Sequence, residues 1–170
     1  KEGMIPIVPI YSSFYQRAYD EVIHDIALQN LPVIMCVDRA GVVGADGETH
    51  QGTLDMAFFR IVPNLTIMAP KDFKELEDML EFAVKLNKPV VIRYPRGGEE
   101  KTKLEKHEEL KLGKAEILKE GKEITIVAIG KRVAKAMEMA EKLKQNEIDA
   151  EVINARFLKP LDKEKIKTSI

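Results

Sequence analysis

The sequence predicts an α/β fold with a parallel sheet, and two observations carry this prediction. Short apolar runs, among them residues 32–38 and 89–95, alternate along the chain with segments of helical periodicity. The runs are rich in valine and isoleucine without alternating polar residues, which is typical of parallel strands that helices cover on both faces. The alternation is interrupted once, at residues 98–111, so we expect two α/β units, residues 1–97 and residues 112–170.

Strands and helices are expected to alternate through the whole of the first unit. In the first helix, Ser12 and Ser13 suit an N-cap, and the apolar spacing predicts one buried face. That face consists of Phe14, Ala18, Val22, Ile26 and Leu28. The expected strands are residues 4–11, 32–38, 65–70 and 89–95, and the expected helices are residues 12–30, 53–62 and 71–87.

The second unit follows a charged segment, residues 98–111, that has almost nothing to bury and is expected to be a solvated linker. Beyond it we expect two strands joined at Glu120 and Gly121, a helix over 131–147, a strand over 148–157, and the start of another helix. A strand is already under way at residue 4, and the second unit is not finished at residue 170. We therefore expect the first unit to be incomplete at its start, the second to be truncated, and the chain to be a piece of a larger protein.

Composition excludes several classes of function. The chain has 27 Lys and Arg against 28 Asp and Glu, and this balance argues against binding to nucleic acid or to a membrane surface. Cys36 is the single cysteine, so no disulfide can form within the chain, and a reduced, cytoplasmic setting is expected. No apolar run approaches the roughly 20 residues of a membrane span. His24, His50 and His107 lack the spacing of a metal site, so no metal ligands are expected in this chain.

The stretch "DRAGVVGADGETHQG", residues 38–52, is the most unusual part of the sequence. It follows directly on an expected buried strand, and it contains acidic residues, an arginine and His50 among four glycines. These glycines form neither a dinucleotide-binding fingerprint nor a P-loop, so they are expected to allow close backbone approach. Because ligands gather at the carboxyl ends of parallel strands, this loop should meet the segment from Tyr11 to Arg17 and the segment from Arg93 to Arg96.

The residues of these three segments each have an ordinary alternative interpretation. A lone loop histidine is more often solvated than catalytic, and Arg39 and Arg96 could be surface arginines rather than forks for a phosphate or carboxylate. A phenylalanine near a helix start, such as Phe14, is more often a core residue than a stacking platform. The interpretation as a ligand site therefore depends on their convergence.

Four motifs together resemble a known family. "YSSFYQRAYDEVIHDIALQNLPV", "DRAGVVGADGETHQG", "PNLTIMAPKD" and "IRYPRG" stand in the order and spacing of the 1-deoxy-D-xylulose-5-phosphate synthases, which are thiamine-diphosphate-dependent relatives of transketolase. The resemblance runs over residues 5–160. It implies a transketolase-like pyrimidine-binding domain at 1–97, a linker at 98–111 and the start of the transketolase C-terminal domain at 112–170.

The resemblance also implies an activity. The family condenses pyruvate with D-glyceraldehyde 3-phosphate, with loss of CO2, in non-mevalonate isoprenoid biosynthesis and in making precursors of thiamine and pyridoxal. Its cofactors are thiamine diphosphate and Mg2+, and the metal and the diphosphate would be held by a domain that this chain lacks. The complete enzyme would be a homodimer, and the 170-residue chain alone would be inactive.

Seven residues acquire expected roles from the resemblance. Phe14 and Arg17 would line the pocket of the cofactor's aminopyrimidine ring, Tyr11, Arg39 and Arg96 would surround the phosphate of D-glyceraldehyde 3-phosphate, and Asp46 and His50 would act at the reacting end.

Two other functions remain open from the sequence. One is another thiamine-diphosphate enzyme of this fold, such as half of a split transketolase, which would use a sugar-phosphate donor in place of pyruvate. The other is a non-catalytic α/β module that binds a phosphorylated ligand.

Overall fold

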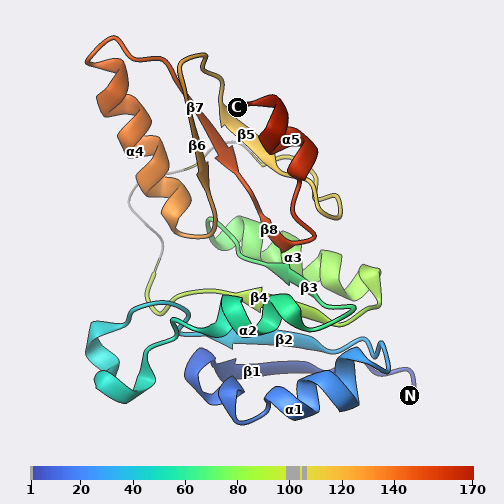
Figure 1. The fold of residues 1–170 in the computed structure, drawn as a ribbon. Coiled ribbons are helices and arrows are strands. Elements are labelled where there is room, and N and C mark those ends of the chain that lie inside the picture. Colours follow the sequence, from blue (N-terminus) through green and yellow to red (C-terminus); the bar gives the residue numbers. More distant parts are fainter. Residues whose placement is uncertain (1, 99–103, 105–106) are drawn as a thin grey trace.

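The first sheet is parallel across its first four strands, as the sequence predicts (Figure 1). In the computed structural model, which describes residues 2–98, 104 and 107–170, its strand order is β1-β2-β4-β3-β8. The last strand, β8, runs antiparallel to β3 and closes one edge. The bounds are β1 Ile7–Tyr11, β2 Ile34–Asp38, β3 Thr66–Met68, β4 Val90–Arg93 and β8 Phe157–Lys159.

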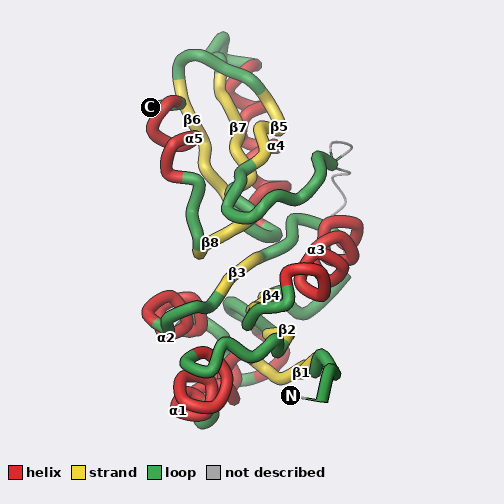
Figure 2. The backbone as a smooth tube through the Cα atoms, turned by 90° about the vertical axis from the view of Figure 1, so that its right-hand side faces the viewer, coloured by secondary structure: helices red, strands yellow, loops and turns green. Residues whose placement is uncertain are grey.

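Helices cover both faces of this sheet (Figure 2). On one side lie α1 (Tyr19–Glu21) and α2 (Asp55–Ile61), and on the other lies α3 (Phe73–Leu86). Helix α3 begins where the sequence predicts a helix, because the Asp72 carboxylate accepts a hydrogen bond from the Glu75 amide at 2.8 Å. The two faces bury separate apolar clusters, so the four parallel strands form the middle layer of a three-layer core.

The expected regular helix over residues 12–30 is wrong. The structure has a 3-10 turn, η1 (Ser12–Gln16), then the single turn of α1, then a π-helical segment, η2 (Val22–Ala27). The 3-10 and π-helical segments do not have 3.6 residues per turn, so the expected apolar face forms only in part: Val22 is buried, and Ala18 and Ile26 pack against the same cluster. The buried apolar residues of this stretch are Tyr15, Val22 and Ala27, whereas Phe14 is 46% and Leu28 56% exposed.

A second, three-stranded sheet has the order β5-β7-β6. Strand β6 is parallel to β7, and β5 is antiparallel to it. Helices α4 and α5 lie on opposite sides of this sheet in Figure 1. The bounds are β5 Glu116–Lys119, β6 Ile124–Ala128, β7 Ala150–Asn154, α4 Arg132–Lys144 and α5 Lys163–Thr168.

The expected single strand over residues 148–157 is also wrong. Strand β7 ends at Asn154, and Arg156 takes a left-handed conformation with φ 56°. This turn redirects the chain into the first sheet, where the Ala69 amide donates to the Arg156 carbonyl at 3.0 Å and β8 follows. The two units therefore share a sheet edge.

Of the expected linker, residues 99–103 and 105–106 lie outside the described residues. Its described end is not simply solvated. Leu110 packs against the cluster on the α3 side of the sheet, and the Glu108 amide donates to the Glu116 carboxylate at 2.8 Å.

A cluster of buried charges lies where the two units meet. Arg156 Nε is 2.8 Å from Glu75 Oε1, and Arg156 Nη2 is 3.0 Å from Glu116 Oε1. Lys71 Nζ lies 3.1 Å from Glu116 Oε2 and 3.4 Å from Glu75 Oε1. All four side chains are 2% exposed or less, and the two cations balance the two carboxylates.

Candidate functional site

The candidate site lies at the carboxyl ends of β1, β2 and β4. These strands are in parallel register, with Tyr11 beside Asp38 and Val37 beside Arg93, so the segments that leave them emerge at one edge. The 38–52 loop forms the lobe at the left end of this sheet in Figure 1. It contains two short 3-10 turns, η3 (Gly44–Asp46) and η4 (Glu48–His50).

Backbone and side-chain hydrogen bonds close this loop on itself. Gly41 and Gly52 exchange amide-to-carbonyl hydrogen bonds of 2.7 and 2.9 Å across its neck. Inside it, the Gln51 side-chain oxygen accepts from the Val43 amide at 2.7 Å, and its nitrogen donates to the Val43 carbonyl at 2.9 Å. Sequence reasoning missed Gln51, because a single amide in a glycine-rich loop carries no pattern. The loop therefore holds its shape through contacts within itself.

Gly52→Ala is expected to disrupt this neck, because no side chain fits there. A Cβ at position 52 would lie 2.4 Å from the Arg39 carbonyl oxygen and 2.7 Å from Ser12 Cβ. Overpacking of this kind costs about 1–3 kcal/mol of unfolding free energy, measured by chemical denaturation. Gly44→Ala in the same loop is the matched control, since a Cβ at position 44 meets nothing within 4 Å. Equal stability of the two variants would contradict this account of the neck.

Aromatic rings and a guanidinium form the floor of the site. The Tyr11 and Phe14 rings stack with centroids 5.2 Å apart at 9°, and the His50 ring meets Phe14 edge-on at 5.2 Å. Arg39 Cζ lies 4.1 Å from the centre of the Tyr11 ring, a cation–π contact. His50 Nδ1 is 2.7 Å from the Thr49 hydroxyl. Phe14 thus remains nearly half exposed because it packs in this cluster rather than in the core.

Asp46 joins two arginines that are far apart in the sequence. Its Oδ1 accepts hydrogen bonds from Arg39 Nη1 and from Arg96 Nη1, the latter at 2.6 Å. The hydrogen bond from Arg39, followed by the charges of both guanidinium groups, lowers the pKa of the Asp46 carboxyl, and the same bond raises the pKa of Arg39. Asp46 is therefore ionised at neutral pH, and the bridge is lost only when the pH falls below the ordinary range of a carboxyl group.

Several buried polar atoms at this site lack a protein partner. Among the described residues, buried side-chain atoms without a hydrogen bond are found at Ser12 Oγ, Ser13 Oγ, Arg39 Nε and Asp46 Oδ2. Buried polar groups in proteins are nearly always satisfied, by protein, water or ligand. These four atoms lie together at one place and are open to hydrogen bonds with water or with a polar ligand.

The structure brings six of the seven expected site residues into one connected cluster. Arg17 is the exception: it is exposed at the end of η1, and within the described residues its side chain has no charged or hydrogen-bonded partner. Sequence reasoning also missed Asp55, which is 1% exposed and pairs with Arg93 at 2.8 Å. A separation of 38 residues between these two gives no local signal.

The described residues form neither a cluster of metal ligands nor a membrane-spanning helix. Within the described part of the chain, no group of three or more His, Cys, Asp or Glu side chains is placed to hold a metal ion. None of the helices described is both long and apolar enough to cross a bilayer.

Two family models match the chain: the transketolase pyrimidine-binding domain over residues 1–99 and the transketolase C-terminal domain over residues 113–170. The 1-deoxy-D-xylulose-5-phosphate synthase of Halothermothrix orenii is 53% identical over 100% of this chain and 27% of its own length. That of Natranaerobius thermophilus is 51% identical over 98% of this chain and 26% of its own length. The chain thus spans about a quarter of the length of these curated relatives.

Solved structures give the same fold. A split gene transketolase, described as an inactive beta4 tetramer, superposes with a TM-score of 0.87 at 33% identity, covering 98% of this chain and 54% of that one. A mutant transketolase of Pichia stipitis superposes with a TM-score of 0.83 at 23% identity, over 96% of this chain and 25% of that one, which supports the fold alone.

Proposed function

This chain belongs to the transketolase family, and on that basis we propose that it is the acceptor-binding part of a 1-deoxy-D-xylulose-5-phosphate synthase. The observation that carries the proposal is the convergence of Arg39 and Arg96 on one carboxylate oxygen beside the Tyr11 ring. Two guanidinium forks and a phenol suit a phosphate ester, since guanidinium binds such groups bidentately. The ligand assigned to them is the phosphate of D-glyceraldehyde 3-phosphate.

Each site residue then has a proposed task. Arg39 and Arg96 bind the phosphate, and Asp46 holds the two guanidinium groups together until it arrives. Because its pKa is lowered, Asp46 is a weak proton acceptor, and the geometry favours this positioning task over proton relay. His50 is proposed to hold a proton at the aldehyde oxygen of the acceptor, where the reaction creates a hydroxyl group.

The residues also fit the aminopyrimidine end of thiamine diphosphate. The half-exposed Phe14 ring offers an apolar face for stacking, and the unpartnered Ser12 and Ser13 hydroxyls lie in the same segment. When bound, the cofactor supplies the nucleophilic carbon that takes up pyruvate and releases CO2. Arg17 stays a proposed member of this pocket wall.

Several further assignments are proposals about the complete protein. We assign Mg2+ and the diphosphate of the cofactor to parts outside this chain, since the relatives are nearly four times its length. We propose a homodimer, as the family resemblance implies. We also propose a reduced, cytoplasmic setting, which the buried free thiol of Cys36 supports. The proposed division of the chain is a pyrimidine-binding domain at 1–97, a linker at 98–111 and part of the C-terminal domain at 112–170.

A donor-specificity assay on the full-length protein tests the proposal. We expect CO2 release and 1-deoxy-D-xylulose 5-phosphate from pyruvate and D-glyceraldehyde 3-phosphate, and no activity from the 170-residue chain alone. The likeness to a split gene transketolase favours one alternative, transfer from a sugar-phosphate donor, which would be seen as turnover of xylulose 5-phosphate without pyruvate. Binding of a phosphate ester without turnover of pyruvate or of xylulose 5-phosphate would instead indicate a non-catalytic module.

His50→Ala is expected to reduce turnover of the full-length enzyme far more than its stability. A positioned acid or base contributes about 10²- to 10⁴-fold to rate, whereas substitutions in exposed loops usually change the unfolding free energy by within about 0.5 kcal/mol. His24→Ala is the matched control, because His24 is exposed and pairs only with Asp20, at 3.0 Å, among the described residues. A large fall in melting temperature with near-normal turnover would show that His50 is structural.

A further inference from the structure

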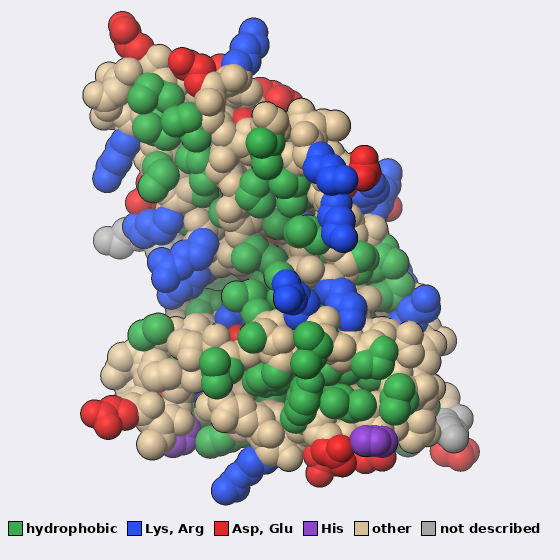
Figure 3. Space-filling model, viewed as in Figure 1, with side chains coloured by type: hydrophobic (Ala, Val, Ile, Leu, Met, Phe, Trp, Pro, Cys, Tyr) green, Lys and Arg blue, Asp and Glu red, His purple; other side chains and the backbone are tan. Residues whose placement is uncertain are grey.

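A hollow lies between the two units, and none of the proposed active-site residues lines it. Its volume is about 410 Å³, within the range of small-molecule sites. The first unit contributes the Ala40–Val42 segment, Met56 of α2 and the end of β4, and the second contributes the turn from β6 into α4. Figure 3 shows Lys and Arg side chains gathered at this hollow, on the left of the molecule.

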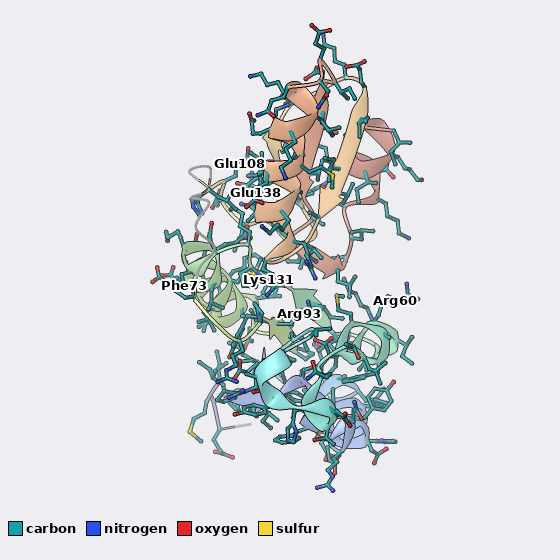
Figure 4. The ribbon with its side chains drawn as sticks, turned by 90° about the vertical axis from the view of Figure 1, so that its left-hand side faces the viewer. Arg60, Phe73, Arg93, Glu108, Lys131 and Glu138 are labelled. Carbon is teal, nitrogen blue, oxygen red and sulfur yellow. The ribbon has the colours of Figure 1, made fainter. Side chains whose placement is uncertain are left out.

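The lining of this hollow is strongly basic. Arg93, Lys131, Arg132 and Lys135 line it, and no acidic residue does. Figure 4 shows Arg93 and Lys131 from the two units at the junction between them. Asp55 neutralises Arg93 at 2.8 Å and Glu138 pairs with Lys135 at 2.8 Å, whereas Lys131 and Arg132 have no acidic partner in the described part of the chain. The hollow therefore carries an excess of positive charge.

These two unpaired cations occupy an unfavourable place. Lys131 is the N-cap of the 13-residue helix α4, Arg132 is its first residue, and its first turn contains no acidic residue. Cations at a helix N-terminus oppose the helix dipole, which favours anions there. The turn also lies at the carboxyl end of β6, the edge where α/β sheets bind ligands. A bound anion would offset the repulsion between these two cations and the repulsion between them and the dipole of α4.

We propose that this hollow binds a small metabolite carrying a phosphate or diphosphate ester. Its phosphate contacts Lys131, Arg132 and the amides that begin α4, and its organic part lies against Met56 and Pro95. Gly41 lines the hollow and also closes the neck of the active-site loop through Gly52, so an occupant touches the base of that loop. The hollow borders the active-site loop, but it is lined by none of the residues to which the proposed activity assigns a role.

Titration of the ¹⁵N-labelled chain with inorganic pyrophosphate, at constant ionic strength, tests the proposal. We expect saturable amide shifts at Gly130, which precedes the N-cap of α4, and at Arg132 and Val133, which begin the helix. The double variant Lys131→Gln/Arg132→Gln should weaken this binding about ten-fold or more, because it removes charge-assisted contacts. Its melting temperature should be unchanged or raised, because the cations oppose the dipole of α4.

Lys163→Gln/Lys167→Gln is the matched control, with the same loss of charge at exposed positions of α5. It should bind pyrophosphate like the wild type, and Arg96→Met should keep the shifts at α4 as well. Equal weakening in the control, shifts that do not saturate, or shifts confined to the 38–52 loop would each overturn the proposal. The last outcome would leave the proposed acceptor site intact, so the two proposals fail separately.

Discussion

Arg156→Met is expected to lower the unfolding free energy by about 3–5 kcal/mol, the cost of removing one partner from a buried ion pair. Arg156 is 2% exposed and contacts the carboxylates of Glu75, from α3, and Glu116, from β5. Without it, Lys71 alone faces two buried carboxylates, and one negative charge is left uncompensated. For a chain of this size, the expected fall in melting temperature is roughly 6–20 °C.

Two further variants separate lost charge balance from lost packing. Glu75→Gln added to Arg156→Met restores neutrality, since Lys71 and Glu116 remain paired at 3.1 Å, so the double variant should be more stable than Arg156→Met alone. Lys85→Met is the surface control: Lys85 is 78% exposed, lies 3.8 Å from Glu81, and should cost less than about 1 kcal/mol. An Arg156→Met chain that unfolds at the wild-type denaturant concentration would refute the balance argument.

This cluster was not predictable from the sequence, and the reason is general. Glu75 and Arg156 are 81 residues apart, and the helical spacing that places Glu75 on the same face as Met79 and Ala83 gives no sign of its partner. Only the turn at Arg156 brings them together, by moving the chain from the second sheet into the first. A three-residue strand such as β8 has too few residues to show any periodicity of its own.

The buried strands were predictable because their residues are almost all apolar. The runs that became β2 and β4 are apolar on both faces, and this requires cover on both sides. Helix α3 was predictable for the same kind of reason, since its apolar spacing and its cap at Asp72 agree. The prediction for the segment after β1 was wrong because its apolar spacing is compatible with a regular helix. The structure instead has a 3-10 turn that buries Tyr15, and the Tyr15 hydroxyl donates to the Val8 carbonyl at 2.9 Å.

The location of the candidate site was predictable from the sequence, but the contacts between its side chains were not. Parallel strands bring their carboxyl ends to one edge, so the convergence of Tyr11, Arg39 and Arg96 followed from topology. The bridge through Asp46 did not, because partners 7 and 50 residues away leave no mark in the sequence. The tasks proposed for these residues stay predictions, and Arg39 offers the sharpest test of them.

Arg39→Met in the full-length enzyme is expected to raise the KM for D-glyceraldehyde 3-phosphate by about 10²- to 10³-fold, because charge-assisted hydrogen bonds to a phosphate are lost. Arg39 connects the parts of the site: it lies over the Tyr11 ring and pairs with Asp46. Its Nε is buried and makes no hydrogen bond among the described residues. The measurement is KM and kcat for this aldehyde and for unphosphorylated D-glyceraldehyde. A residue that acts through the phosphate should affect only the first.

The comparison of the two aldehydes distinguishes recognition from structure. If Arg39→Met raises the KM for both aldehydes equally, Arg39 supports the loop or the chemistry, and the phosphate assignment is wrong. Arg60→Met, at an exposed position of α2, should change neither substrate. Arg39→Lys should recover little, since an ammonium group cannot reproduce the planar fork that meets both Asp46 and a phosphate. A selective loss with the first aldehyde, shared by Arg96→Met, would place the phosphate between the two guanidinium groups, where Asp46 Oδ1 now accepts from both.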